Sequence, residues 1–200
     1  MIVVLDYGVG NLFSIKHSFK KIGYQVEVCL DVEELKRSDA IIFPGVGNFA
    51  AASKNIKNVR DILIKLLLED QVPTLGICLG MHLFFPKSDE GGGDGLGIFQ
   101  GQVTRLPKYV KTPHMGWNNL RVIKSSPILD GITEGDYFYF AHSYYALPED
   151  KGVVAAETGY GIDFPSVISS GNIFGVQFHP EKSGKPGELV MKNFVKLIKR

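Results

Sequence analysis

Residues 72–82 read VPTLGICLGMH, an apolar run that reaches a cysteine and continues into a stretch compatible with a helix. Gly76 and Gly80 flank Cys78, and glycine permits the sharp strand-to-helix turn that exposes a side chain above a sheet. The amino end of the following helix would face the sulfur and favour the thiolate, the reactive form. This pattern predicts a nucleophilic cysteine, with the backbone N–H of Leu79 facing an oxyanion. The alternative for Cys78 is a small buried hydrophobic residue.

On both sides of this segment, the first half of the chain alternates short apolar runs with helical stretches. We expect strands at 2–5, 26–29, 40–43 and 74–77, and helices at 11–22 and 56–68, with a short helix from residue 79. Such alternation implies a parallel sheet covered by helices on both faces. The site of such a sheet lies outside the carboxyl ends of its strands.

The second half has a different pattern. After a glycine-rich loop at 90–97, we expect strands at 102–105, 137–140, 153–157, 166–169 and 173–178, and a last helix at 186–199. Little helix separates these strands, so part of the sheet should be antiparallel. The sequence therefore predicts an α/β fold: a central mixed, mostly parallel sheet flanked by helices, with an antiparallel extension in the C-terminal half.

Length and composition point to an ordinary globular protein. The chain has 200 residues, enough for one sizeable domain, which we expect to span residues 1–200. Charged residues make up 22% and the net charge is +1 without clusters, so we expect neither nucleic acid nor a membrane as a partner. Two cysteines do not make a secreted disulfide framework, and the first residues read as a buried strand rather than a signal peptide. We expect a cytoplasmic protein.

A histidine and a glutamate near the other end of the chain can complete the chemistry of Cys78. Residues 175–184 read GVQFHPEKSG. Residues two apart in an extended chain share a face, and we expect Pro180 to hold this region extended. Glu181 can then orient the ring of His179, whose other nitrogen faces the thiol. This is the logic of nucleophile, base and orienting acid.

Two other interpretations concern metals and phosphates. Cys78 could bind a metal with His82, His114, His142 or His179, but no pair of these has the spacing of a familiar zinc motif. Gly45 and Gly47, after the expected third strand, let backbone N–H groups approach a ligand, as a second oxyanion donor requires. A phosphate loop is the alternative, but its Lys and Ser/Thr are absent.

Several motifs together resemble a known family. GICLG at 76–80, FHPE at 178–181 and PGVG at 44–47 have the order and context of the class I, triad-type glutamine amidotransferases. DYGVGN at 6–11, PHMGWN at 113–118, FYFAHSYY at 138–145 and FHPEKS at 178–183 are similar to the glutaminase subunits of imidazole glycerol phosphate synthases. The similarity runs along the full length.

The resemblance implies a function. It implies that Cys78 attacks the side-chain amide of glutamine, with His179 as base and Glu181 as orienting acid. Ammonia would pass to a (β/α)8-barrel cyclase, the partner in a heterodimer of histidine biosynthesis. No cofactor or metal is implied. The remaining matched positions are Val46 and Leu79 in the oxyanion hole, Gly45, Gly47, His82, Glu90, Ser143 and Tyr144 around glutamine, and Asn11, Trp117 and Lys182 at the partner interface.

One departure from the family concerns substrate binding. The family usually has Gln, whose amide helps to hold the substrate, where this chain has His82. Pro86 likewise replaces an acidic residue. Two alternative functions stay open: an amidotransferase subunit that supplies ammonia to a different synthase, and a partner-binding scaffold with weakened glutaminase activity.

Overall fold

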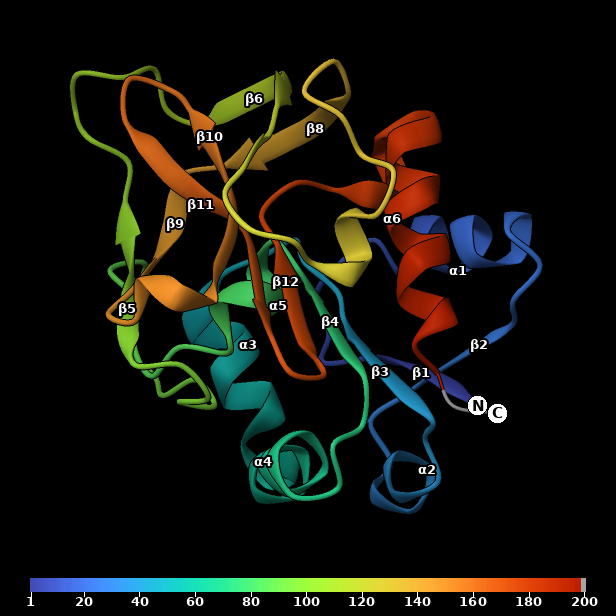
Figure 1. Ribbon diagram of the computed structural model, residues 1–200. Helices are drawn as coiled ribbons and strands as arrows, with labels where there is room; N and C mark the ends of the chain where they lie inside the picture. The colour runs from blue at the N-terminus through green and yellow to red at the C-terminus, as the bar shows by residue number, and fades with distance from the viewer. Residues whose placement is uncertain (199–200) are drawn as a thin grey trace.

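A central eight-stranded sheet organises the molecule (Figure 1). The computed structural model describes residues 1–198, and the strand order is β2-β1-β3-β4-β12-β11-β10-β7. The parallel part consists of β2 (Val26–Cys29), β1 (Ile2–Leu5), β3 (Ala40–Phe43), β4 (Thr74–Ile77) and β12 (Ile173–Val176). The antiparallel part consists of β11 (Asp163–Ser170), β10 (Val154–Gly159) and β7 (Arg121–Val122). The mixed, mostly parallel sheet expected from the sequence is confirmed.

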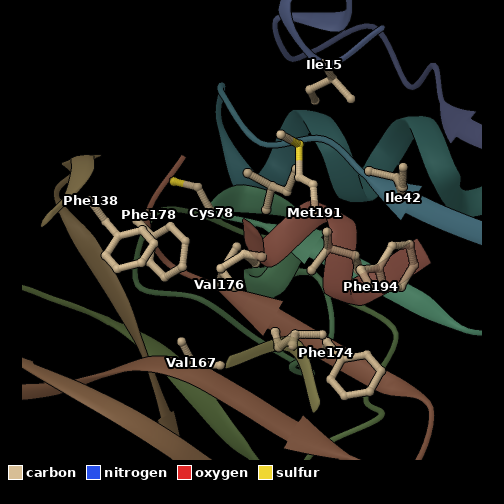
Figure 2. Close-up of a cluster of buried hydrophobic side chains, with 14 of the residues drawn as sticks. Ile15, Ile42, Cys78, Phe138, Val167, Phe174, Val176, Phe178, Met191 and Phe194 are labelled. Carbon is tan, nitrogen blue, oxygen red and sulfur yellow. The ribbon is translucent and has the colours of Figure 1, made fainter. Parts of the chain in front are cut away.

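Helices cover both faces of the sheet because neighbouring strand residues point to opposite sides. One face packs against α1 (Leu12–Lys21) and α6 (Gly184–Lys196), where Ile15, Met191 and Phe194 belong to one apolar cluster with Ile42 and Phe174 (Figure 2). The other face packs against α2 (Val32–Lys36), α3 (Phe49–Ile56) and α4 (Arg60–Leu68). The fully buried runs of the parallel strands, such as IVVL in β1, follow from this double covering.

Two antiparallel ribbons form two-stranded sheets of their own, which are not paired strand to strand with the large sheet. One pairs β5 (Gly101–Arg105) with β9 (Tyr144–Pro148), and the other pairs β6 (His114–Asn119) with β8 (Tyr137–His142). Figure 1 shows the β6–β8 ribbon at the top of the molecule, at the end opposite α4. Short elements complete the fold: α5 (Leu79–His82) and the 3₁₀ helices η1 (Lys57–Val59), η2 (Pro127–Leu129), η3 (Lys151–Val153) and η4 (Pro180–Lys182).

Every strand expected from the sequence overlaps a strand of the structure, in both halves of the chain. The expected helix 56–68 covers only η1 and α4, and α2 and α3 were not expected. In the second half, the last expected strand ends at Val176, and α6 begins at Gly184, two residues before the expected start. The expected end of that helix, residue 199, lies outside the described residues. Among residues 1–198, no helix is both long and apolar enough to cross a membrane.

Candidate active site

Cys78 sits at a strained turn between β4 and α5. Its backbone has φ +49° and ψ −105°, a conformation that residues other than glycine rarely adopt. The sequence suggested that the flanking glycines make this turn. Instead, Cys78 itself adopts the unusual backbone angles, and the glycines leave room for the turn. A Cβ on Gly80 would lie 2.1 Å from the carbonyl oxygen of Phe43, and one on Gly76 would lie 2.7 Å from the backbone nitrogen of Met81. The elbow is therefore packed directly against β3.

His179 and Glu181 form a buried pair. The Nδ1 atom of His179 lies 2.9 Å from Oε1 of Glu181, and both side chains are almost fully buried. Pro180 does not hold the region extended, so that expectation was wrong. His179 is extended, as the residue before a proline tends to be, but Pro180 opens the 3₁₀ helix η4. The fixed φ of proline suits the first position of a helical turn, and this turn brings Glu181 back to the ring.

The other ring nitrogen of His179 is free for Cys78. Within residues 1–198, Nε2 of His179 has no hydrogen-bond partner. Burial lowers the pKa of His179, but the nearby Cys78 sulfur and the hydrogen-bonded carboxylate of Glu181 outweigh this effect and raise the pKa to about 10. An imidazolium between a carboxylate and a sulfur stabilises the thiolate. The three side chains named from the sequence are thus brought together.

The main chain of His179 is fastened to the β6–β8 ribbon. Its N–H donates to the carbonyl of Tyr139 at 2.8 Å. The hydroxyl of Ser183 donates to the carbonyl of His179 at 2.6 Å and accepts from the N–H of Tyr139 at 3.0 Å. The position of the histidine therefore depends on that of β8.

A cavity of about 220 Å³ opens beside the sulfur. It is lined by Gly45, Val46, Gly47, Cys78, Leu79, His82, Glu90, Pro113, Met115, Ala141, His142, Ser143 and Tyr144. All the expected oxyanion and substrate residues are among them, whereas His179 and Glu181 are not. The lining comes from the carboxyl ends of β3 and β4 and from the two ribbons. A volume of this size suits a small molecule such as an amino acid.

The glycine turn after β3 lies against the elbow. A Cβ on Gly45 would fall 1.6 Å from the carbonyl oxygen of Ile77 and 2.9 Å from the nitrogen of Leu79. Only glycine allows this approach, which brings the backbone of Val46 to the same side of the cavity as Leu79. The hydroxyl of Tyr7 donates to the carbonyl of Pro44 and fixes the start of the turn.

Glu90 and His82 are both engaged within the protein. A carboxylate oxygen of Glu90 accepts from the N–H of Phe49 at 2.9 Å, at the first turn of α3, and burial raises the pKa of this carboxyl. Nε2 of His82 lies 2.9 Å from Oε1 of Gln177. Burial lowers the pKa of His82 to about 4 despite this hydrogen bond, so the ring is neutral near pH 7.

Three polar residues at the site were not named as site residues from the sequence. Gln177 donates through Nε2 to Sγ of Cys78 at 3.5 Å. Tyr7 is buried close enough to the sulfur that Cys78, after desolvation, contributes to the raised pKa of its hydroxyl. His142 lines the cavity and donates to the carbonyl of Tyr144 at 2.9 Å. A signal existed for Gln177: it lies two residues before His179 in an extended run, and such residues share a face.

The three residues expected at a partner interface are all exposed, and two of them lie beside the ring of Tyr139. The ring of Trp117 lies 5.9 Å from that of Tyr139, and Nζ of Lys182 lies 5.7 Å from the same ring. Asn11 is the N-cap of α1, where its side chain accepts from the N–H of Ser14 at 3.1 Å.

Comparison with known proteins agrees with this geometry. A family model described as glutamine amidotransferase class-I matches residues 3–197. A solved structure described as a glutamine amidotransferase has a TM-score of 0.79 at 21% identity, covers 99% of each chain, and supports the fold. The fold and site thus define a class-I glutamine amidotransferase.

Relatives that match along the full length identify the particular family within this class. Imidazole glycerol phosphate synthase subunit HisH of Caldanaerobacter subterraneus subsp. tengcongensis is 49% identical, covering 100% of this chain and 99% of the relative. The protein of that name from Archaeoglobus fulgidus is 46% identical, covering 100% of both. The chain belongs to this family, the glutaminase subunits of imidazole glycerol phosphate synthase.

Proposed function

We propose that the chain hydrolyses glutamine to glutamate and ammonia through a thioester on Cys78. The supporting observation is the arrangement at the elbow. The cysteine adopts a strained turn beside a cavity, and the adjacent histidine is hydrogen-bonded to a buried glutamate through its far nitrogen. A buried structural cysteine requires none of these features. The chain would act as one glutaminase domain without metal or cofactor.

The first half of the reaction releases ammonia. The thiolate of Cys78 attacks the carboxamide carbon, and the carbonyl electron pair moves onto oxygen. The N–H groups of Leu79 and Val46 stabilise this oxyanion. The N–H of Leu79 is available because the first N–H groups of a helix have no partner within it. The imidazolium of His179 gives its Nε2 proton to the nitrogen. The C–N bond then breaks, and a thioester and ammonia remain.

The second half regenerates the enzyme. His179 takes a proton from water while the oxygen attacks the thioester carbon. The C–S bond breaks, its electron pair returns to sulfur, and glutamate leaves. Glu181 holds the ring in place and stabilises its charged form throughout.

Substrate binding uses the cavity lining. Glu90 would pair with the α-ammonium group of glutamine, and Ser143 and Tyr144 would face the amino-acid end. Gly45 and Gly47 let the backbone approach the carboxamide, and the neutral ring of His82 can accept one hydrogen bond. The position of these residues around one cavity supports the assignment.

The partner we propose is a cyclase with a (β/α)8 barrel, in a heterodimer. The relatives are named as subunits of imidazole glycerol phosphate synthase. Ammonia from the cavity would be used by the cyclase to form imidazole glycerol phosphate and aminoimidazole carboxamide ribonucleotide. Exposed Trp117 and Lys182, with Asn11, would face the barrel. Because both cysteines are free thiols, we place the protein in the reducing environment of the cytoplasm.

The test is release of glutamate from glutamine by the chain together with a candidate cyclase and its nucleotide ligand. We expect Cys78→Ala to lose at least about a thousandfold in rate. Cys29→Ala, at the only other cysteine and half-buried, is the matched control and should keep the parental rate. Parental turnover by Cys78→Ala would refute the mechanism. Turnover that responds only to a different synthase would refute the partner alone.

A further inference from the structure

Gln177 contacts the reacting sulfur, but the mechanism above gives it no role. It directly follows β12, and its side chain is fully buried. Its amide bridges two residues: Nε2 donates to Sγ of Cys78 at 3.5 Å, and Oε1 lies 2.9 Å from Nε2 of His82. The backbone N–H of Gln177 donates to the carbonyl of Ser166 at 2.9 Å, which fixes the start of the side chain. The amide is therefore held at both ends.

The orientation of this amide decides what the sulfur meets. With Nε2 toward Cys78, the sulfur receives an N–H donor, which favours the thiolate. With the amide turned over, the carbonyl oxygen would face the sulfur and repel its charge. A side chain as symmetrical in shape as glutamine does not choose between these orientations by packing alone.

His82 determines which orientation the Gln177 amide adopts. The neutral ring carries one N–H, and a ring that donates from Nε2 can bond only to the oxygen of the amide. That bond turns the amide nitrogen toward Cys78. Glutamine is usual at this position in the family. The histidine found here supplies an N–H to Gln177, a donor that a glutamine side chain also carries.

We propose that Gln177 is a hydrogen-bond donor to the Cys78 thiolate, and that His82 is a positioning residue that orients the Gln177 amide for it. The inference rests on the proposed function only for the use of the thiolate. In the free enzyme the hydrogen bond stabilises the sulfur anion. The bond weakens when the sulfur forms the thioester and returns when water breaks the C–S bond and the electron pair goes back to sulfur.

The other titratable groups near the sulfur come from several elements. They are Tyr7 after β1, His142 at the end of β8, and His179 and Glu181 after β12. A test of Gln177 must therefore compare variants in which all four remain.

The experiment measures alkylation of Cys78 by iodoacetamide as a function of pH. The isolated chain carries Cys29→Ser, so that only one thiol reacts. Because the reagent attacks the thiolate, the midpoint reports the ionisation of the Cys78–His179 pair. We expect Gln177→Met to raise this midpoint by about one pH unit, the effect of a lost hydrogen bond to a charged group. Gln25→Met, at an exposed glutamine, is the matched control and should leave it unchanged.

The His82 variants test the orienting role. His82→Leu should raise the midpoint nearly as much as Gln177→Met, and the double variant no more than either, since both remove one interaction. His82→Gln, which keeps an N–H donor, should hold the parental midpoint. An unchanged midpoint in Gln177→Met, or additive shifts in the double variant, would overturn the proposal. If Gln177→Met does not fold, the comparison of His82→Leu with His82→Gln decides.

Failure of this inference differs from failure of the proposed function. Alkylation needs neither glutamine nor the cyclase. Normal glutamine hydrolysis with no midpoint shift would remove only the role of Gln177. A shift as expected, with full hydrolysis by Cys78→Ala, would remove the proposed function and leave the hydrogen bond.

Discussion

Close packing holds Cys78 in its strained conformation at the elbow. A left-handed φ on a residue with a side chain costs roughly 1–3 kcal/mol, so neighbouring contacts must hold it. Those contacts are backbone against backbone: Gly80 against Phe43, and Gly45 against Ile77. The position of Cys78 therefore depends on two glycines, Gly45 and Gly80, whose lack of a side chain allows the close backbone contacts.

This packing gives a prediction for Gly80→Ala. The added methyl group would lie 2.1 Å from the carbonyl oxygen of Phe43, so the elbow and β3 must separate. Overpacking of this kind costs about 1–3 kcal/mol, and we expect the thermal unfolding midpoint to fall by about 5 °C. Glutamine hydrolysis should fall more than tenfold because the sulfur moves. Calorimetry and a glutaminase assay measure the two effects.

Gly92→Ala is the control, because a Cβ there meets nothing within 4 Å. It should match the parent in both assays. Equal behaviour of the two variants would show that the elbow adapts to the methyl group.

At the residue scale, local patterns in the sequence pointed to residues that lie close together in the structure. Cys78 between two glycines, and His179 two residues from Glu181, are local patterns. Gln177 was read as part of a strand because it stands between apolar residues, and its contact with Cys78 joins positions 99 residues apart. Such a contact exists only after β12 pairs with β4.

At the scale of elements, the β6–β8 ribbon joins the proposed partner surface to the base. Three large apolar side chains are exposed on it: Met115, Trp117 and Tyr137. Exposed apolar side chains that group together on a surface mark a contact site for another molecule. The same ribbon is hydrogen-bonded to the main chain of His179 through Tyr139. A cyclase on this ribbon would contact an element that positions the active site.

Trp117→Ala tests the ribbon as a docking surface. The side chain is 56% exposed, and truncation of a large aromatic anchor weakens an interface by about 2 kcal/mol, so affinity for the cyclase should fall about thirtyfold. Leu68→Ala is the matched control, since Leu68 is 48% exposed at the end of α4, away from the ribbon (Figure 1). Titration calorimetry gives both affinities. An equal affinity for parent and Trp117→Ala would place the cyclase elsewhere.

Prediction of elements from sequence depended on how each segment meets the core. The buried parallel strands are continuous apolar runs and were found. The segment that forms β6 was not, because its regular alternation places apolar Met115 and Trp117 on the exposed side and polar His114 on the buried side, the reverse of the usual arrangement. α3 was missed although Asn48 caps it locally by accepting from the N–H of Ala51 at 3.2 Å; the distant carboxylate of Glu90 adds a second contact, to the N–H of Phe49.

At the scale of the whole molecule, three buried histidines tie stability to pH. Burial lowers the pKa values of His82 and His114 to about 4 and of His142 to about 3. The unfolded chain binds protons at these rings near pH 6.5, whereas the folded chain does not until about pH 4. Stability is therefore fully present above about pH 6.5 and is lost as the pH falls toward 4. His179 acts in the opposite sense: its pKa is raised to about 10, so its stabilisation is fully present below about pH 6.5 and is lost as the pH rises toward 10.

We predict that His82→Gln makes this acid loss shallower by about one proton. Urea unfolding between pH 7 and pH 4.5 measures the slope for parent and variant, and carboxylates that titrate in both cancel in the comparison. His17→Gln, at an exposed histidine on α1, is the control and should keep the parental slope. Identical slopes for His82→Gln and the parent would mean that His82 takes up its proton in the folded state.

The place of β12 in the sheet has a consequence for synthesis. Among the strands described, β12 is the last in the chain, yet it lies inside the sheet between β4 and β11. Gln177 and His179 follow it directly, so a growing chain carries the cysteine long before it carries the base. Until that strand inserts, the emerging polypeptide has a thiol but no active site. The proposed hydrolysis of glutamine, with its release of ammonia, therefore requires that β12 has been made and has taken its place in the sheet.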